Sequence, residues 1–388
     1  MSAAGQGDDI MLKLVHTADW HLGRQFRSFP EDGALKLSRA RLEVLDRILL
    51  TADRYAVDAV LCAGDLFDEP NPATEWWEQT AARLRKCPST RPVFLLPGNH
   101  DPLTTESIWA KGHKFRGLLP DWVHVVDRED FQYSFPNGAV LYAVPCMSKA
   151  GQRDPTESIP KRAAGDERIR IGMVHGSTFD AKDWQTNFPI HPDAVLERGL
   201  DYLAIGDTHG FRYIPPGRQH PPTIYPGAPE ATAFDEKDPG CVAVVFINRQ
   251  RVTTVRPERV ARWTWEERTV TSIDELRALV RRTDLADRVL RLHINMKVPA
   301  PEYDEAEVLI EELQGTPARH ARAGVLELDR NGLELETATI DQHCGDLPDV
   351  LRSAVTRLSR VAENDPAQRL IAGRALFHLY RSAKRKAS

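Results

Sequence analysis

Short apolar runs recur through the N-terminal part of the chain, and each of them stops at polar side chains. Residues 93–96 read Val-Phe-Leu-Leu and are followed by Pro-Gly-Asn-His-Asp. A run of β-favouring residues closed by Pro-Gly predicts a buried strand that ends abruptly. The same pattern occurs at residues 15–18, 59–62, 171–174 and 202–205, each followed within three residues by Asp or His. The sequence therefore predicts several buried strands whose ends carry polar groups.

Side chains at the carboxyl ends of the strands in an α/β sheet converge on one crevice, where such enzymes build their sites. The candidate ligands at these ends are three Asp, three His and one Asn: Asp19, His21, Asp65, Asn99, His175, Asp207 and His209. Carboxylates, imidazoles and an amide oxygen suit two divalent first-row cations better than a structural zinc, which favours thiolates. Any one of these residues alone is more often structural, but five such clusters in order predict a dinuclear metal site.

The order of these motifs resembles that of the calcineurin-like metallophosphoesterases: D-x-H, G-D-x-x-D, G-N-H-D, H-G and G-x-x-H. Within that superfamily, residues 17–23 and 64–68 look like those of SbcD-type DNA repair exonucleases. Residues 225–230, which an acidic stretch and a strand follow, are similar as well. The resemblance covers roughly residues 10–260 and implies an α/β fold in which helices flank a β-sandwich.

The resemblance also implies a role for each motif residue. One metal ion would be held by Asp19, His21, Asp65 and His209, and the other by Asp65, Asn99, His175 and Asp207. Asp65 would then bridge the two cations. His100 would stabilise the transition state and protonate the leaving oxygen, and Asp101 would orient its imidazole.

The closing motif departs from the family pattern, which is usually G-H-x-H. Here it is Gly206-Asp207-Thr208-His209, so a third aspartate replaces an imidazole. A harder and more anionic site favours Mn²⁺ or Mg²⁺ over Zn²⁺. We therefore expect two divalent cations, with Mn²⁺ first and Mg²⁺ or Fe²⁺ as alternatives.

Composition narrows the class of protein. The formal net charge of −5 over 388 residues gives no global signature of nucleic-acid binding, so a DNA enzyme of this composition must concentrate its basic residues locally. Five cysteines without a C-x-x-C motif predict reduced thiols in a cytosolic protein. No run reaches the length of a membrane span, and residues 1–9 look like a disordered leader without the apolar core of a signal peptide. We therefore expect a cytoplasmic protein.

The composition becomes charged and aromatic around residues 256–268, where we place a domain junction. The expected order is a phosphoesterase (nuclease) domain over 10–260, a small α/β cap over 261–345 and a basic helical segment over 346–388. Leu290, Leu292, Ile294 and Met296 alternate with polar residues, which predicts a cap strand with one buried face. The C-terminal segment has apolar residues at helical spacing. It either docks on the coiled coil of a partner or only packs on its own cap.

These observations favour a metal-dependent DNA phosphodiesterase, an exonuclease with endonuclease capacity that acts in repair or defence. The family resemblance adds an SbcC-like coiled-coil ATPase as a partner and allows a homodimer. A second interpretation is a phosphoesterase that acts on a small nucleotide or a phosphoprotein. A third is a DNA-end-binding scaffold whose metals only organise the fold.

Overall fold

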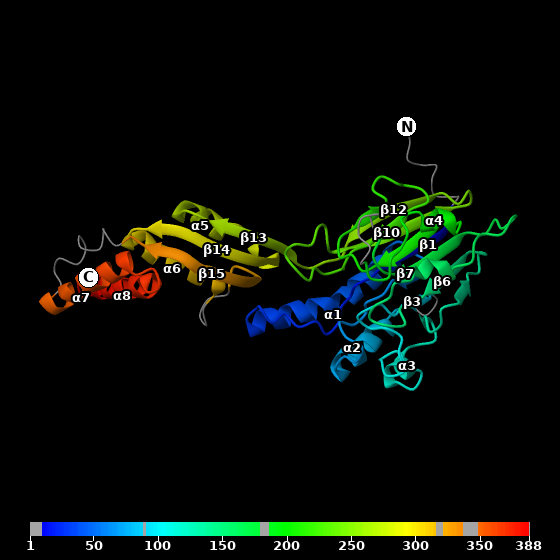
Figure 1. Cartoon of the computed structure of the whole chain (residues 1–388), viewed down its shortest axis with the longest axis horizontal. Helices are drawn as coiled ribbons and strands as arrows, with labels where there is room; N and C mark the ends of the chain where they lie inside the picture. The colour runs from blue at the N-terminus through cyan, green and yellow to red at the C-terminus, as the bar shows by residue number, and fades with distance from the viewer. Residues whose placement is uncertain (1–9, 88–90, 179–185, 316–320, 337–347, 388) are drawn as a thin grey trace. The chain divides into compact units, whose positions relative to one another are not determined.

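A computed structural model describes residues 10–87, 91–178, 186–315, 321–336 and 348–387. The chain divides into two compact units (Figure 1). The first comprises Met1–Arg27 and Ala34–Trp263, and the second comprises Ser28–Gly33 and Thr264–Ser388. The predicted leader over residues 1–9 and Cys344 lie outside the described residues. The described cysteines, Cys62, Cys87, Cys146 and Cys241, are free thiols.

The first unit is a β-sandwich of two six-stranded sheets (Figure 1). One sheet has the order β12 (Thr253–Arg259), β11 (Cys241–Asn248), β1 (Ile10–Thr17), β2 (Ala59–Cys62), β3 (Val93–Leu95) and β4 (Val123–Val125). The other has the order β5 (Phe131–Ser134), β6 (Val140–Val144), β7 (Arg170–His175), β8 (Tyr202–Gly206), β10 (Thr223–Tyr225) and β9 (Arg212–Ile214). The predicted fold class is confirmed.

The sandwich core lies between the two sheets. Leu14, Leu61 and Phe94 from the first sheet share one buried cluster with Leu141 and Ile171 from the second. These strands are apolar on nearly every residue because helices cover their outer faces as well. The covering elements are α1 (Glu31–Arg54), α2 (Thr74–Leu84) and α3 (Lys114–Leu118) on the first sheet, and α4 (Ala194–Glu197) with a short 3₁₀ helix, η1 (Pro155–Ser158), on the second.

The strands that precede the predicted ligands run parallel within each sheet. β1 pairs with β2 and β2 with β3 in one sheet, and β7 pairs with β8 in the other. Their carboxyl ends therefore lie at one edge of each sheet. A hydrogen bond of 3.0 Å from the Asp207 backbone N–H to the Asp19 side-chain carboxylate joins the two edges. This arrangement brings the five strand ends together.

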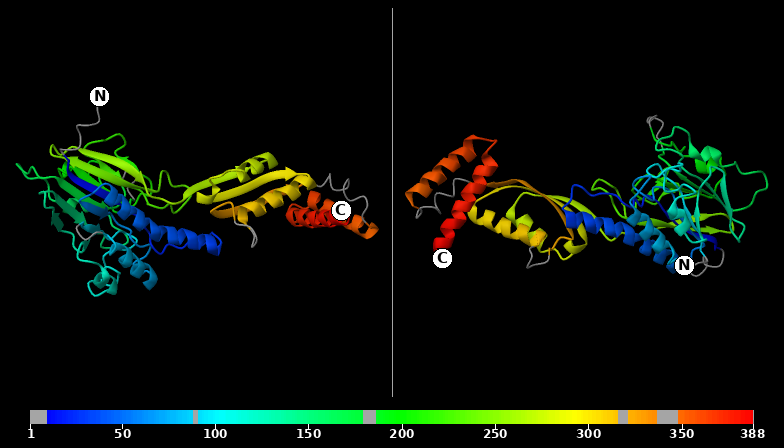
Figure 2. Two further views of the ribbon diagram at one scale, coloured as in Figure 1. Left: turned by 180° about the vertical axis from the view of Figure 1, so that it is seen from behind. Right: turned by 90° about the horizontal axis from the view of Figure 1, so that it is seen from below.

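The second unit contains a parallel sheet of β13 (Thr264–Val270), β14 (Arg288–Val298) and β15 (Val325–Leu335) (Figure 2). The helices α5 (Ile273–Val280) and α6 (Ala300–Gln314) contact each other and pack on this sheet. In β14, Leu290, Leu292, Ile294 and Met296 are buried, which confirms the predicted one-sided strand. The unit also contains a short 3₁₀ helix, η2 (Leu285–Asp287), and two C-terminal helices, α7 (Asp349–Asn364) and α8 (Arg369–Ala387).

The C-terminal helices α7 and α8 form a hairpin that packs on this cap. Leu376, Phe377 and Tyr380 of α8 are buried in the cap core, and the Phe377 ring lies 4.5 Å from the Tyr303 ring of α6, centroid to centroid. The hairpin therefore packs on its own unit through this side, and docking on a partner stays a prediction for its exposed side. Among the described helices, none combines the length and apolar composition that a membrane span requires.

Candidate metal centre

Four of the predicted ligands have an unusual backbone conformation. Asp19, His21, Asp65 and Asp207 have positive φ angles of 55°, 43°, 52° and 107°. Such a conformation costs a non-glycine residue about 1–3 kcal/mol and persists only where the surroundings enforce it. Here the Asp19 and His21 N–H groups donate to the carbonyls of Gly64 and Asp65, each at 3.0 Å. The turns after β1 and β2 thus hold one another in the strained form that directs the ligand side chains inward.

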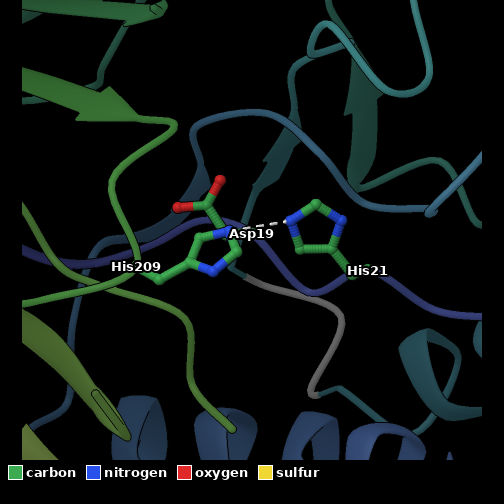
Figure 3. Close-up of side chains that lie close together, drawn as sticks. All are labelled: Asp19, His21 and His209. Atoms are coloured by element: carbon green, nitrogen blue, oxygen red, sulfur yellow. Dashed lines mark hydrogen bonds between the residues drawn. The ribbon is translucent and has the colours of Figure 1, made fainter. Parts of the chain in front are cut away.

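Asp19, His21 and His209 form the first ligand group (Figure 3). Their nearest nitrogen and oxygen atoms all lie within 4.8 Å of one another. The Nε2 atoms of His21 and His209 are only 3.1 Å apart, although the two residues are far apart in the sequence. Facing imidazole nitrogens with a buried carboxylate are a donor set that a divalent cation would accept.

His175 is the centre of a second ligand group. Its Nδ1 donates to the Ala63 carbonyl at 2.8 Å, which directs Nε2 toward the cluster. Nε2 lies 2.8 Å from Asn99 Oδ1, 3.4 Å from Asp65 Oδ2 and 3.9 Å from Asp207 Oδ1. All the residues predicted for the second metal ion are therefore gathered around one imidazole.

Asp65 lies between the two groups. Its Oδ2 is 3.4 Å from His175 Nε2 and 3.8 Å from His21 Nε2, and its Oδ1 accepts from the His100 N–H at 2.9 Å. The carboxylate is almost fully buried. A single aspartate is thus within reach of both ligand groups, as the predicted bridging role requires.

The electrostatics of the cluster fit a site for cations. Burial raises the pKa of Asp19 to about 6, because a carboxylate without compensating charge is costly to bury. Burial opposes a charge on His175 as well, yet the neighbouring carboxylates, with Asp65 first, raise its pKa to about 10. Without metal, protonated histidine must supply the positive charge that these carboxylates need. Divalent cations would take over that role, so the residues present fit a dinuclear centre.

The Asp207 side chain, where the chain departs from the family pattern, faces the cluster. Its Oδ1 lies 3.9 Å from His175 Nε2, and its Oδ2 accepts a hydrogen bond from the Ser177 hydroxyl. The Asp207 side chain therefore does not turn away from the cluster to cap the following turn.

The predicted role of Asp101 is corrected by the structure. Its two carboxylate oxygens accept from the Gly98 N–H at 2.9 Å and the Phe67 N–H at 3.0 Å. Among the contacts of the described residues, none joins this carboxylate to the His100 ring. Instead the His100 Nδ1 lies 3.1 Å from the Asp68 carbonyl oxygen and 4.0 Å from Asp68 Oδ1. A fully buried carboxylate satisfies the backbone donors beside it, so Asp101 holds the turn that carries His100.

Asp68 is a site residue that the sequence reasoning missed. Besides its position beside His100, its Oδ1 lies 3.1 Å from His21 Nδ1 and 3.4 Å from a guanidinium nitrogen of Arg24. The sequence did contain a signal for this residue, because Asp68 is the last residue of the G-D-x-x-D motif. Two further residues had weaker signals: Glu236, in the acidic stretch after residues 225–230, and Arg41, in an amphipathic helix.

Arg41 supports the site from α1. Its guanidinium is buried and donates to the carbonyl oxygens of Trp20 at 2.9 Å, Asp19 at 3.2 Å, Glu230 at 3.0 Å and Ala231 at 3.2 Å. Five fixed N–H donors make arginine suited to such multiple contacts. The side chain thereby ties the turn after β1 to the segment around residue 230.

The family comparison agrees with this geometry. Residues 12–211 match the model of the calcineurin-like phosphoesterases. The chain belongs to this family. The resemblance predicted from the strand-end motifs is therefore confirmed.

Relatives of this phosphoesterase include proteins with nuclease names. It is 27% identical over 58% of its length to the uncharacterized metallophosphoesterase YhaO of Bacillus subtilis. It is 37% identical over 43% of its length to a subunit of the nuclease SbcCD of Rhodobacter capsulatus, and 24% identical over 62% to the DNA double-strand break repair protein Mre11 of Methanosarcina acetivorans. The aligned regions span 55%, 39% and 37% of those three proteins.

Proposed function

We propose that this phosphoesterase is a metal-dependent DNA phosphodiesterase, an exonuclease with endonuclease capacity that acts in repair or defence. The observation that carries the proposal is the pair of ligand groups at one edge of the sandwich, with the Asp65 carboxylate between them. The names of the SbcCD and Mre11 relatives support DNA as the substrate.

The proposed ligands of the first cation are Asp19, His21, Asp65 and His209, and those of the second are Asp65, Asn99, His175 and Asp207. When bound, two divalent cations supply positive charge to a phosphate group and lower the pKa of a water molecule that can attack it. We propose Mn²⁺ as the preferred ion, because the oxygen-rich donor set with three aspartates favours harder cations.

His100 is the proposed general acid. Its side chain is 43% exposed, so a substrate could reach it, and it lies in a ligand group with His21 and Asp65. The Asp68 carbonyl accepts a hydrogen bond from Nδ1, which leaves Nε2 as the atom that can pass a proton to the leaving oxygen. Asp68 therefore takes the orienting role that the sequence had assigned to Asp101.

The substrate class can be tested with two small esters. The Mn²⁺-loaded protein is expected to hydrolyse bis-p-nitrophenyl phosphate, a diester, faster than p-nitrophenyl phosphate, a monoester. Hydrolysis of the monoester alone would contradict the proposal and favour a small nucleotide or phosphoprotein as the substrate. Hydrolysis of neither ester, with metal bound, would favour a binding scaffold.

Asp207→Ala is expected to lose mainly the second metal ion, because three remaining ligands and a water hold a cation weakly. Asp207→His is expected to restore two bound ions and to shift the preference toward Zn²⁺, since imidazole is a softer donor than a carboxylate. Titration of Mn²⁺ and Zn²⁺ into the apo-proteins measures both effects. Two tightly bound Mn²⁺ ions in the alanine variant would remove Asp207 from the ligand set.

We also propose that the α7–α8 hairpin docks on a partner, an SbcC-like coiled-coil ATPase. Val350 and Ile371 on these helices are 80% and 70% exposed, although the opposite side of the hairpin is buried in the cap. Val350→Asp with Ile371→Asp is expected to abolish co-elution with such an ATPase and to leave basal cleavage unchanged. Leu50→Asp, at a 65% exposed position of α1, is the matched control. Unchanged co-elution of the double variant would contradict docking, and a shift in its elution volume without the ATPase would instead indicate a homodimer through this hairpin.

A further inference from the structure

Glu236 lies behind His209, on the side opposite the metal cluster. His209 Nε2 faces His21 at 3.1 Å, whereas His209 Nδ1 lies 2.6 Å from Glu236 Oε1 and 3.1 Å from the Thr232 hydroxyl oxygen. The Glu236 side chain is only 9% exposed. The imidazole is therefore held between a buried carboxylate and the ligand group.

The Glu236 carboxylate has little freedom to turn. Its Oε2 accepts from the Thr232 N–H at 2.9 Å, and its Oε1 accepts from the Thr232 hydroxyl. Both oxygens are thus assigned: Oε2 to a backbone donor, and Oε1 to Thr232 and His209.

The segment that carries Glu236 is fixed against the turn that carries His209. The Ala228 N–H donates to the His209 carbonyl at 2.9 Å, and the Phe211 N–H donates to the Asp238 carbonyl at 3.3 Å. The two segments approach each other so closely at Gly210 that a side chain is excluded there, because a Cβ would lie 2.1 Å from the Lys237 carbonyl oxygen. Arg41 ties the same segment to Asp19, as described above. The carboxylate is therefore placed by backbone contacts on both sides of the site.

We propose that Glu236 is a positioning residue that fixes the tautomer and ring orientation of His209 for metal binding. A carboxylate only accepts hydrogen bonds, so Nδ1 must carry a hydrogen, and in the neutral ring Nε2 then presents its lone pair to the cluster. The inference rests on the proposed metal-binding role of His209, but it concerns the metal site and not the choice of substrate.

This role predicts an unusual order of Mn²⁺ affinities among variants of Glu236. In Glu236→Gln, the amide oxygen must replace Oε2, because the Thr232 N–H needs an acceptor. The amide NH₂ then faces His209 Nδ1, donates to it and places the hydrogen on Nε2, where no metal can bind. Glu236→Ala leaves the ring free to choose its tautomer, with the Thr232 hydroxyl as a remaining acceptor. Glu236→Gln, although isosteric, is therefore expected to weaken Mn²⁺ binding more than Glu236→Ala does.

Calorimetric titration of MnCl₂ into the apo-proteins tests this order. Glu236→Ala is expected to weaken one of two sites about 10- to 100-fold, the usual effect of removing such a partner. Glu236→Gln should weaken that site about five- to tenfold more, because a hydrogen bond must also be broken. Thr232→Val keeps the carboxylate and the backbone donor and removes only the hydroxyl, so its loss of affinity should be smaller than that of Glu236→Ala.

A second measurement does not depend on metal. Long-range ¹H–¹⁵N correlation spectra of histidine-labelled apo-protein are expected to show hydrogen on His209 Nδ1 in the wild type and on Nε2 in Glu236→Gln. A purely packing role predicts the opposite order of affinities, since glutamine fills the space of glutamate and alanine leaves a void. Equal or tighter Mn²⁺ binding by Glu236→Gln than by Glu236→Ala, or an unchanged His209 tautomer, would overturn the proposal. If the wild type and the variants show this order of Mn²⁺ affinities but the wild type cleaves no diester, only the proposed function is contradicted.

Discussion

The Asp65→Ala protein is expected to lose both its metal pair and its phosphodiesterase activity. Asp65 is the carboxylate that reaches both ligand groups, with Oδ2 at 3.4 Å from His175 and 3.8 Å from His21. Its removal takes one ligand from each proposed cation and leaves the remaining buried aspartates to repel one another. It also removes the acceptor of the His100 N–H, so the general acid would lose its position.

Elemental analysis after gel filtration in Mn²⁺ measures this prediction directly, together with hydrolysis of the diester. Asp130→Ala is the control, because that carboxylate is 88% exposed and lies outside the ligand groups. A circular dichroism melt shows whether the Asp65 variant is folded. Two metal ions retained by a folded Asp65→Ala protein would refute the bridging assignment.

His100→Ala is expected to behave differently from Asp65→Ala, since metal content should remain near that of the wild type. Catalysis should fall by roughly 10²- to 10⁴-fold, the usual contribution of a general acid. The loss should be large for DNA, whose leaving group is an alkoxide, and smaller for a nitrophenyl ester, whose leaving group needs little protonation.

The comparison of the two leaving groups separates proton transfer from binding. His191→Ala is a matched control, because its ring is 45% exposed, close to the 43% of His100, and it lies outside the ligand groups. Equal losses on both substrates would assign His100 to phosphate binding alone. Full activity on DNA would exclude it from catalysis.

The sequence predicted the ligand set because each ligand follows a buried strand, and parallel strands place their ends at one edge. It also predicted the helix that carries Phe377 and Tyr380, because apolar spacing reveals one face of a helix. Spacing does not reveal what covers that face, so docking on a partner and packing on the cap were left open. The structure places Phe377 against Tyr303 in the cap core.

The supporting residues could not be predicted in the same way. The family resemblance assigned Asp101 to the His100 ring, but its carboxylate accepts from the backbone of Gly98 and Phe67. The atom that does contact the ring comes from Asp68, 32 residues earlier. Arg41 reaches Glu230 over 189 residues. Such contacts depend on how loops meet in the folded chain, so a motif can mark Asp68 as a candidate but cannot name the ring that it contacts.

Cleavage of end-labelled linear DNA during a Mn²⁺ titration of the metal-free protein tests the central claim most directly. Two cations that share Asp65 predict that cleavage appears as the second equivalent binds and that the Asp65→Ala protein stays inactive at every concentration. A protein that binds two equivalents of Mn²⁺ and leaves the labelled DNA intact would contradict the claim.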